Sequence, residues 1–265
     1  MPEILYEVDG SVATVWLNRP ERLNALTFDM GELFQQALRQ ADGDPAIRVV
    51  VLSGKGKGFC AGDDVEAAWG DPRMAETIRG LADIRPPTTP EAVAILNCSK
   101  PIIAAVNGVA VGWGMDMAIL ADIIVASDQA RFGQLFVKMG LCADIAGLWR
   151  LPQLVGPAKA AELLLTGDLI GAQEAKDLGL ISAVVPHDKL LTAARDLADR
   201  IAANPPLAVR AIKEGLRRAV GRRPADLEEL GAFVGNALGR LFQTEDHAEA
   251  AAAFREKRQP AFKGR

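Results

Sequence analysis

Phe59-Cys-Ala-Gly-Asp-Asp64 and Asn107-Gly-Val-Ala-Val-Gly-Trp-Gly-Met-Asp116 are the two stretches on which the interpretation of this sequence rests. Each comes soon after a short apolar run, Val49–Leu52 in the first case and Ile102–Val106 in the second. Apolar runs of that length, rich in β-branched residues and bounded by turn signals, are typical of strands buried on both faces. Glycines beyond their ends let the backbone approach a ligand closely and leave N–H groups free to point at it. Brought together, two such loops would form an oxyanion hole.

The rest of the first half alternates strand and helix patterns. Residues 4–17 indicate a hairpin that turns at Asp9-Gly10. Thr27 is a candidate N-cap for a helix to Ala41, whose apolar residues recur at helical spacing. Further elements are expected as a helix over 91–97, a helix from about 113 and a strand over 123–126. This alternation predicts an α/β core, whereas the weak pattern and terminal prolines of residues 66–89 predict a mobile stretch beside the first loop.

Composition limits the possible class of protein. The 265 residues are 49% hydrophobic and can bury one substantial core, and the formal net charge of -4 gives no support to a nucleic-acid partner. The cysteines Cys60, Cys98 and Cys142 are odd in number, lie in apolar settings and lack metal-ligand spacing. They are expected to be reduced and structural, as in a cytoplasmic protein.

No membrane segment is expected. The first residues have neither the basic-then-apolar pattern of a secretion signal nor the arginine-rich pattern of a transit peptide. The longest apolar region, residues 101–127, is interrupted by Asn107, Asp116 and Asp122, so a membrane span would bury carboxylates at its centre. Together with the cysteines, this predicts a cytoplasmic protein.

After Arg150 the pattern becomes helical. One apolar stripe follows Asp188, a candidate cap, and consists of Leu190, Ala194, Leu197 and Ile201. A second stripe consists of Leu227, Leu230, Val234, Ala237 and Leu241. Such stripes are too few to make a core of their own and are expected to pack on a partner. We therefore predict a core over residues 1–200 and a helical C-terminal region over 201–265.

The motifs together resemble the enoyl-CoA hydratase/isomerase (crotonase) family. They are F-C-A-G-x-D at Phe59–Asp64, K-P-I-I-A-A-V-N-G about forty residues later, then G-x-G-x-[DE] and A-D-I-I-V-A. The likeness extends from Asn18 to Lys263. It implies a spiral of ββα turns, a C-terminal region that forms a homotrimer or a hexamer of two trimers, and an acyl-CoA thioester substrate. Coenzyme A is then part of the substrate, and no separate cofactor or metal is expected.

The resemblance assigns an oxyanion hole to the backbone N–H groups of Asp63 and Trp113. Abstraction of a proton next to a thioester carbonyl places negative charge on its oxygen, and one preorganised donor contributes roughly 3–4 kcal/mol to stabilising it. The side chains at these positions are not required for this role. A tryptophan at position 113, where relatives often have glycine, is expected to crowd the acyl pocket.

Three positions decide which reaction is expected. Asp116 stands where hydratases of the family have their first catalytic glutamate, although an aspartate in a first helical turn is also favoured by the helix dipole. Phe136 stands where hydratases have their second glutamate, and phenylalanine cannot move a proton. Asp144 matches the acid/base aspartate of dienoyl-CoA isomerases and of ring-opening isomerases of phenylacetyl-CoA breakdown. Its apolar neighbours are expected to raise its pKa, and its alternative role is the N-cap of a helix over 145–155.

The same resemblance implies the coenzyme A site. The residues assigned to it are Arg22, Leu23, Ala25, Ala61, Asp63, Asp64, Val65, Trp113, Phe262 and Lys263. The last two lie in a tail that is expected to complete the pocket across a subunit boundary.

The favoured hypothesis is an isomerase that moves a double bond by a 1,3-proton shift with Asp144 as the acid/base. The first alternative is a hydratase that uses Asp116 and Asp144 as a pair. The second is a non-catalytic acyl-CoA or RNA binder, for which the basic segment from Arg217 to Arg223 is the only support, and such a segment is usually a solvated face. His187 and His247 lie far from both loops, so no catalytic triad is expected.

Overall fold

The computed structural model describes residues 2–82, 89–204, 206–219, 239, 242–258 and 260. The strands are β1 (Ile4–Asp9), β2 (Val12–Leu17), β3 (Val49–Gly54), β4 (Ile102–Val106), β5 (Val109–Val111), β6 (Ile123–Ser127), β7 (Arg131–Gly133), β8 (Ile170–Gly171) and β9 (Ala183–Val185). The helices are α1 (Phe28–Gly43), α2 (Val65–Gly70), α3 (Pro72–Ala82), α4 (Pro90–Asn97), α5 (Trp113–Leu120), α6 (Leu151–Val155), α7 (Pro157–Thr166), α8 (Ala172–Asp177), α9 (Leu190–Ala202), α10 (Pro206–Ala219) and α12 (Glu245–Glu256). Short 3-10 helices cover Pro20–Arg22, Leu135–Met139 and His187–Lys189, and a π-helix covers Ala146–Arg150.

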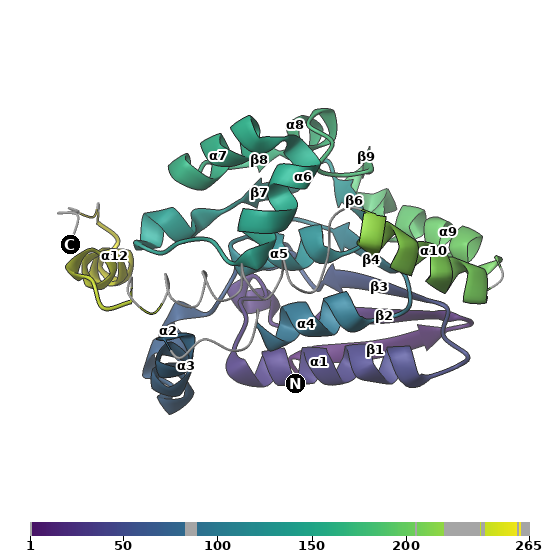
Figure 1. The fold of residues 1–265 in the computed structure, drawn as a ribbon, viewed down its shortest axis with the longest axis horizontal. Coiled ribbons are helices and arrows are strands. Elements are labelled where there is room, and N and C mark those ends of the chain that lie inside the picture. The colour runs from purple at the N-terminus through teal and green to yellow at the C-terminus, as the bar shows by residue number, and fades with distance from the viewer. Residues whose placement is uncertain are drawn as a thin grey trace.

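Within the described residues, the larger sheet has the strand order β1-β2-β3-β4-β6-β9, and the smaller one has the order β5-β7-β8. The predicted hairpin is present, with Asp9 opposite Val12 and Gly10 at a φ of 60°. From β2 onward the larger sheet is parallel. The carboxyl ends of β3 and β4 therefore lie side by side, and the two glycine loops leave the sheet at the same edge (Figure 1).

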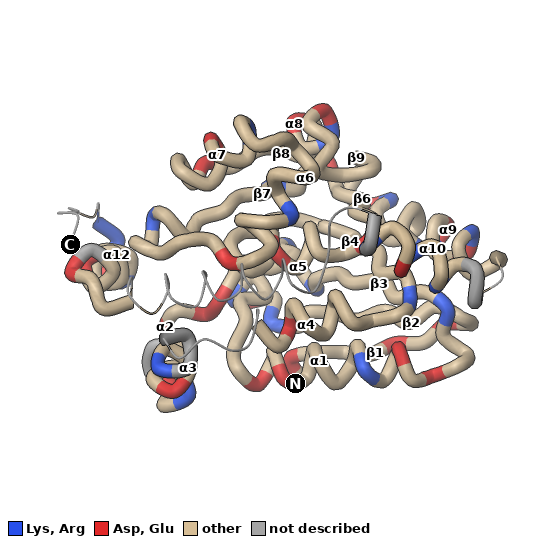
Figure 2. The backbone as a smooth tube through the Cα atoms, viewed as in Figure 1, with Lys and Arg blue, Asp and Glu red and all other residues tan. Residues whose placement is uncertain are grey.

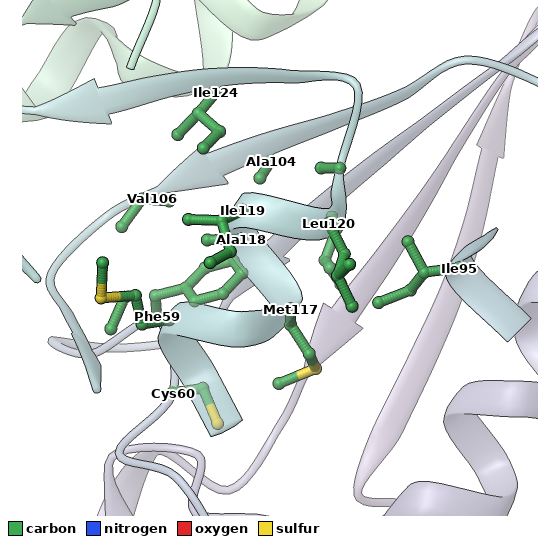
Figure 3. Packing of buried hydrophobic residues seen from close by; sticks show 14 of the residues in the cluster. Phe59, Cys60, Ile95, Ala104, Val106, Met117, Ala118, Ile119, Leu120 and Ile124 are labelled. Atoms are coloured by element: carbon green, nitrogen blue, oxygen red, sulfur yellow. The ribbon is translucent and has the colours of Figure 1, made fainter. Parts of the chain in front are cut away.

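Both faces of this sheet are covered. On one face, alternate residues of β3 and β4 such as Leu52 and Ala104 pack with residues of α1, α4 and α5. The close-up in Figure 3 shows Phe59, Met117 and Leu120 in this layer. On the other face, the intervening residues pack against α9. The continuous apolar runs of β3 and β4 follow from this two-sided burial, as the sequence predicted.

Helix α1 begins where the sequence predicted it. The hydroxyl of Thr27 accepts a hydrogen bond from the Met30 N–H at 3.0 Å, which satisfies one of the free donors of the first turn. The helix buries Met30, Phe34 and Leu38 on one face against the sheet.

The sequence predicts a mobile stretch over residues 66–89, whereas residues 65–82 form α2 and α3. The carboxylate of Asp64 caps α2 by accepting the Ala67 N–H at 3.1 Å. Pro72 is the first residue of α3, where its missing N–H costs nothing. Both helices are short, and the apolar stripe of α3, formed by Met74, Ile78 and Leu81, is only two turns long, so the pattern is weaker than that of α1.

The first of the two C-terminal apolar stripes packs on the sheet of its own chain rather than on a partner subunit. Leu190 and Ala194 on α9 are buried against the sheet. Asp188 does not cap this helix, which begins after Lys189 without a side-chain hydrogen bond. The second stripe, over residues 227–241, lies outside the described residues.

Helices α10 and α12 contact different parts of the core. On α10, the Lys213 ammonium is buried and reaches the Asp122 carboxylate at 2.6 Å. On α12, the His247 Nδ1–H donates to the Met139 carbonyl at 2.9 Å. No helix in the described part of the chain has the length and apolar character that a membrane crossing requires.

Candidate active site

Main-chain pairing brings the two glycine loops together. The N–H groups of Phe59 and Cys60 donate to the Val109 carbonyl, and the Val111 N–H donates back to the Cys60 carbonyl at 3.1 Å. The side-chain amide of Asn107 adds hydrogen bonds to the carbonyls of Gly56 and Gly58, at 2.9 and 3.0 Å. The prediction that these distant stretches meet is confirmed.

Gly112 and Gly114 make the contact possible. Gly112 has a φ of 52°, which strains any residue with a side chain, and it lies just before the first residue of α5. A methyl group added to Gly114 would lie 2.1 Å from the Cys60 carbonyl oxygen. The start of α5 can therefore press directly on the first loop.

Two unpaired N–H groups point out of this junction. Among the described residues, the N–H groups of Asp63 and Trp113 donate no hydrogen bond, while Leu26, Asp64 and Gly112 on either side donate to carbonyls. A methyl group added to Gly62 would lie 3.7 Å from the Trp113 nitrogen, so the two donors belong to adjacent backbone. Since the first N–H groups of a helix have no partner within the helix, the Trp113 donor also carries the positive end of the α5 dipole.

The indole of Trp113 was expected to crowd an acyl pocket. It is only 4% exposed and belongs to the hydrophobic core cluster. Most of its bulk is therefore accommodated by packing rather than by open space.

Asp144 is a buried carboxylate at the start of a helical segment. It is 8% exposed, and its Oδ1 accepts the Ile145 N–H at 2.6 Å. Its carbonyl also accepts the Leu148 N–H, but the helical segment begins at Ile145 without a side-chain capping bond, so Asp144 is not the N-cap that the alternative proposed. Burial raises the pKa of Asp144 to about 6, with a further rise from the Glu91 charge, although the Ile145 hydrogen bond lowers it.

Asp116 is more deeply enclosed than Asp144. It is 0% exposed, and its Oδ1 accepts a hydrogen bond from the Gln134 side-chain amide at 2.7 Å. Burial and then the charge of Asp144 hold the pKa of Asp116 well above its usual range, against the lowering effect of the Gln134 bond. The neutral form of Asp116 is therefore favoured in the folded protein.

Glu91, on α4, is a third member of this acidic group that the sequence did not reveal. Burial raises the pKa of Glu91, which accepts a hydrogen bond from Gln35 at 2.9 Å. The pKa of Asp63 is raised by its dense surroundings and then by the charges of Glu91 and Asp144. The side chain of Asp63 is nevertheless accessible to solvent. A side chain that solvent reaches although protein atoms surround it closely lies on a concave surface, so Asp63 lines a hollow in the protein.

Phe136 lies next to the unpaired donors. Its ring carbon Cζ is 3.8 Å from the position that a methyl group on Gly112 would occupy. The ring comes from the 3-10 helix after β7, and it is half-buried. An aromatic ring thus stands beside the start of α5, at the position where the resemblance puts a glutamate in hydratases.

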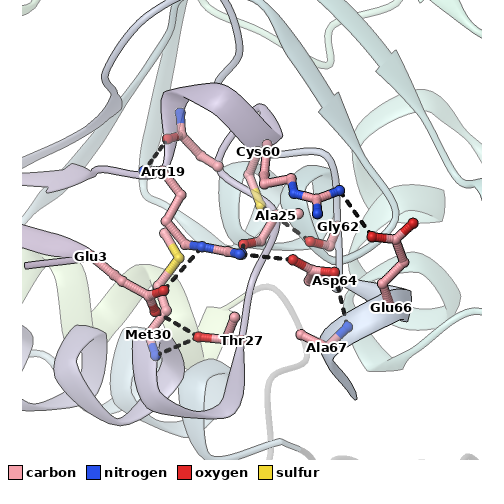
Figure 4. Close-up of polar contacts among 12 residues, drawn as sticks. Glu3, Arg19, Ala25, Thr27, Met30, Cys60, Gly62, Asp64, Glu66 and Ala67 are labelled. Atoms are coloured by element: carbon pink, nitrogen blue, oxygen red, sulfur yellow. Dashed lines mark hydrogen bonds and ion pairs between the residues drawn. The ribbon is translucent and has the colours of Figure 1, made fainter. Parts of the chain in front are cut away.

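Two of the segments assigned to coenzyme A lie in contact, as Figure 4 shows. The Leu26 N–H donates to the Gly62 carbonyl at 2.8 Å, and the Arg22 guanidinium pairs with Glu66 at 3.0 Å. The Asp64 carboxylate, which caps α2, also binds Arg19 at 2.8 Å. The structure thus shows a scaffolding role for Asp64, while Leu23 is exposed on the outer side of the junction.

Of the residues assigned to the coenzyme A site, Arg22, Leu23 and Asp63 are exposed, and Ala25, Ala61 and Val65 are half-buried. Phe262 and Lys263, which were assigned to the same site, lie outside the described residues. Within the described part of the chain, no three His, Cys, Asp or Glu side chains are placed to hold a metal ion.

The basic segment of α10 gives little support to RNA binding. Arg217 is half-buried and donates to the Cys98 carbonyl at 3.1 Å, so its guanidinium serves the core. Arg222 and Arg223 lie outside the described residues. In the view of Figure 2, basic and acidic positions are interspersed along the described helices rather than gathered by sign.

The model of the enoyl-CoA hydratase/isomerase family matches residues 7–265. The chain belongs to this family. It is 38% identical over 266 residues to a probable enoyl-CoA hydratase of Rhizobium meliloti, covering 99% of this chain and 98% of the relative. It is 35% identical to the 1,2-epoxyphenylacetyl-CoA isomerase of Escherichia coli, over 100% of both chains.

The fold agrees with this assignment. An enoyl-CoA hydratase structure from Mycobacterium avium subsp. paratuberculosis superposes with a TM-score of 0.86 at 27% identity, covering 99% of each chain. The predicted crotonase fold, with its α/β core and helical C-terminal region, is confirmed.

Proposed function

We propose that this family member is an acyl-CoA isomerase that moves a carbon–carbon double bond, with Asp144 as its acid and base. The observation that carries the proposal is the asymmetry of the site. Asp144 is a carboxylate with a raised pKa that keeps some accessible surface, Asp116 is closed off from solvent, and Phe136 supplies no carboxylate.

The reaction balances with one carboxylate. Ionised Asp144 takes a proton from the α-carbon of a 3-enoyl thioester, and the electron pair of that bond delocalises into a dienolate. Negative charge collects on the thioester oxygen, where the N–H groups of Asp63 and Trp113 stabilise it. Neutral Asp144 then returns the proton to the γ-carbon, which leaves a conjugated 2-enoyl thioester and an ionised carboxylate. No group beyond the coenzyme A of the substrate is required.

Phe136 supports isomerisation over hydration. Addition of water in the manner of this family uses two carboxylates to hold and activate one water molecule. An aromatic ring beside the unpaired donors displaces water from that position and leaves the dienolate to be protonated by Asp144.

The substrate proposal rests on contact between the two glycine loops and the Arg19–Leu26 segment. We propose that coenzyme A binds at Arg22, Leu23 and Ala25 and along 61–65, with its thioester directed to Trp113. We also propose that the protein forms a homotrimer or hexamer in the cytoplasm. In this assembly, a tail from a neighbouring subunit completes the nucleotide pocket.

One experiment tests the reaction class. The protein is incubated separately with 3-enoyl-CoA and with 2-enoyl-CoA, and the products are identified by mass and by chromatography against standards. Isomerisation of 3-enoyl-CoA at unchanged mass is the expected result. Rapid gain of one water by 2-enoyl-CoA would overturn the isomerase proposal.

Hydration is the second candidate, because several similar relatives carry the name hydratase. It requires Asp116 and Asp144 to act as a pair, and the charge of Asp144 does act on Asp116. The complete burial of Asp116 argues against it, since that carboxyl has no surface to offer a water molecule.

A further inference from the structure

Two buried polar atoms remain unpaired at the Asp116–Gln134 contact. Gln134 Nε2 donates to Asp116 Oδ1 at 2.7 Å, while Asp116 Oδ2 and Gln134 Oε1 are inaccessible to solvent and have no hydrogen-bond partner among the described residues. Leaving two buried oxygens without a donor costs free energy at each. Both oxygens belong to planar, two-pronged groups that are already joined at their other prong.

One added proton satisfies both atoms. A carboxylic acid and a primary amide can form a ring of two hydrogen bonds, in which the amide N–H donates to one acid oxygen and the acid O–H donates to the amide oxygen. Rotating the Gln134 amide by half a turn does not help, because it would set two oxygens against each other at the existing contact. Protonation of Asp116 supplies the missing donor without any further group.

We propose that Asp116 is a neutral carboxylic acid whose Oδ2–H donates to Gln134 Oε1, so that Gln134 acts as a positioning residue that holds the protonated carboxyl in place. Gly147 makes room for this amide, since a methyl group there would lie 3.3 Å from both Oε1 and Cδ of Gln134. The protonation of Asp116 does not depend on the function proposed above. Only its consequence for Asp144 as the base rests on that function.

The environment favours the neutral form. The charges that act on Asp116 are those of Asp144 and Asp63, and the elements packed against α5 also carry Cys60, Glu91 and Arg150. Three of these groups are acids, and Cys60 is a buried thiol whose pKa is raised to about 12. At Arg150, burial lowers the pKa and the charge of Asp122 raises it. Strand β5 contributes only apolar side chains. A negative charge at Asp116 would be repelled by these acids. It would also raise the pKa of Asp144 further, so that less of Asp144 would be ionised.

The first test compares unfolding by urea across pH for the wild type and Asp116→Asn, at equal protein concentration. Asparagine can form the same ring with Gln134, so the variant should fold. If an aspartate is neutral in the folded protein and ionised in the unfolded chain, the stability of the protein falls as pH rises above about 3.9. The ratio of the two unfolding constants should therefore change by up to tenfold per pH unit in favour of the variant.

Asp42→Asn is the matched control. Burial opposes ionisation of Asp42, but hydrogen bonds from the Ser99 hydroxyl and N–H and the charge of Lys100 lower its pKa overall. Its contribution to stability is complete above about pH 3.9, so this ratio should stay flat where the Asp116 ratio changes. A flat ratio for both variants would overturn the proposal.

The second test is the infrared spectrum in heavy water at neutral pH. The wild type should show the carbonyl band of a protonated carboxyl that Asp116→Asn removes and that Gln134→Leu shifts. If that band is missing, Asp116 is ionised, and if Gln134→Leu leaves it in place, the ring does not exist. Neither readout involves turnover, so the proposal can stand or fall independently of whether the protein isomerises or hydrates its substrate.

Discussion

Asp144 differs from its acidic neighbours by combining burial with residual access, and this makes it the residue to change first. Asp144→Asn keeps the size of the side chain and its place at the start of the π-helix segment, but it removes the base. We expect a loss of about 10²–10⁴-fold in exchange of the substrate α-proton with deuterium, measured by mass. Binding of the CoA thioester should be unchanged within a few fold. Exchange at the wild-type rate would exclude Asp144 as the base.

A pH profile tests the same residue without removing it. The active form of Asp144 is ionised and its pKa is raised to about 6, so kcat/KM for 3-enoyl-CoA should fall about tenfold per unit below that pH. Because the charge of Glu91 raises this pKa, Glu91→Gln should move the acid limb to lower pH. The control is Glu162→Gln on the exposed side of α7, for which the limb should not move. If Glu91→Gln left the acid limb of the kcat/KM profile at the same pH, a group other than Asp144 would be responsible for the limb.

At the scale of elements, the site depends on how closely α5 approaches the first loop. Gly114→Ala would place a methyl group 2.1 Å from the Cys60 carbonyl, and backbone cannot move aside cheaply there. We expect a loss of roughly 2–4 kcal/mol in unfolding free energy and a fall in kcat, since one of the two donors is displaced. Gly215→Ala on α10 is the control, because no atom of the described residues lies within 4 Å of its added methyl group. Alanine there should stabilise the helix by up to about 1 kcal/mol. Equal behaviour of the two variants would contradict the close contact.

The elements that carry regular patterns could be predicted from the sequence, and the reason is visible in their packing. β3 and β4 are buried on both faces and therefore read as unbroken apolar runs. Asp9-Gly10 fixes a turn by its own backbone preference. By contrast, α2 and α3 depend on local capping by Asp64 and on Pro72, and the apolar stripe of α3 is only two turns long.

The candidate site could be predicted only where glycine spacing or the family motif marked it. Asp63, Trp113, Asp116 and Asp144 were found in this way. Glu91 and Gln134 were not, because their importance comes from contacts made across the fold, to Gln35 and to Asp116 respectively. A polar residue directly after a short buried strand, as Gln134 follows β7, is the one signal that was available.

At the scale of the whole molecule, the candidate catalytic groups and the stabilising polar groups occupy opposite ends of the parallel strands. The glycine loops follow the carboxyl ends of β3 and β4. Asp122 lies at the amino end of β4, where its Oδ2 accepts the Ile102 N–H at 2.8 Å and pairs with Lys213 of α10. Lys213 also donates to the Lys100 carbonyl at 2.6 Å. Helix α10 is thus fastened to the core away from the candidate site, whereas α12 binds the Met139 carbonyl of the 3-10 helix that carries Phe136. The stability that depends on α10 should therefore be separable from activity by mutation.

Lys213→Met tests this separation. The ammonium is 6% exposed, and its loss leaves the Asp122 carboxylate, itself 23% exposed, without a cation. Because Asp122 keeps some solvent and the Ile102 N–H, we expect about 2–3 kcal/mol of destabilisation in urea, below the range for a fully buried pair. Trypsin should cleave more readily after Arg210, the first basic residue of α10. The rate with 3-enoyl-CoA should be retained under native conditions, because the unpaired N–H groups lie at the other end of the strands.

Two further variants make this test decisive. Lys189→Met removes an exposed lysine whose nearest carboxylate is 3.9 Å away, and it should change stability by less than about 0.5 kcal/mol. Asp122→Asn combined with Lys213→Met removes both charges, so the double variant should recover part of the lost stability. If Lys213→Met matched the Lys189 control in urea and in trypsin, the buried pair would not be what holds α10 on the core. If it lost activity in proportion to stability, the two ends of the sheet would be coupled rather than independent.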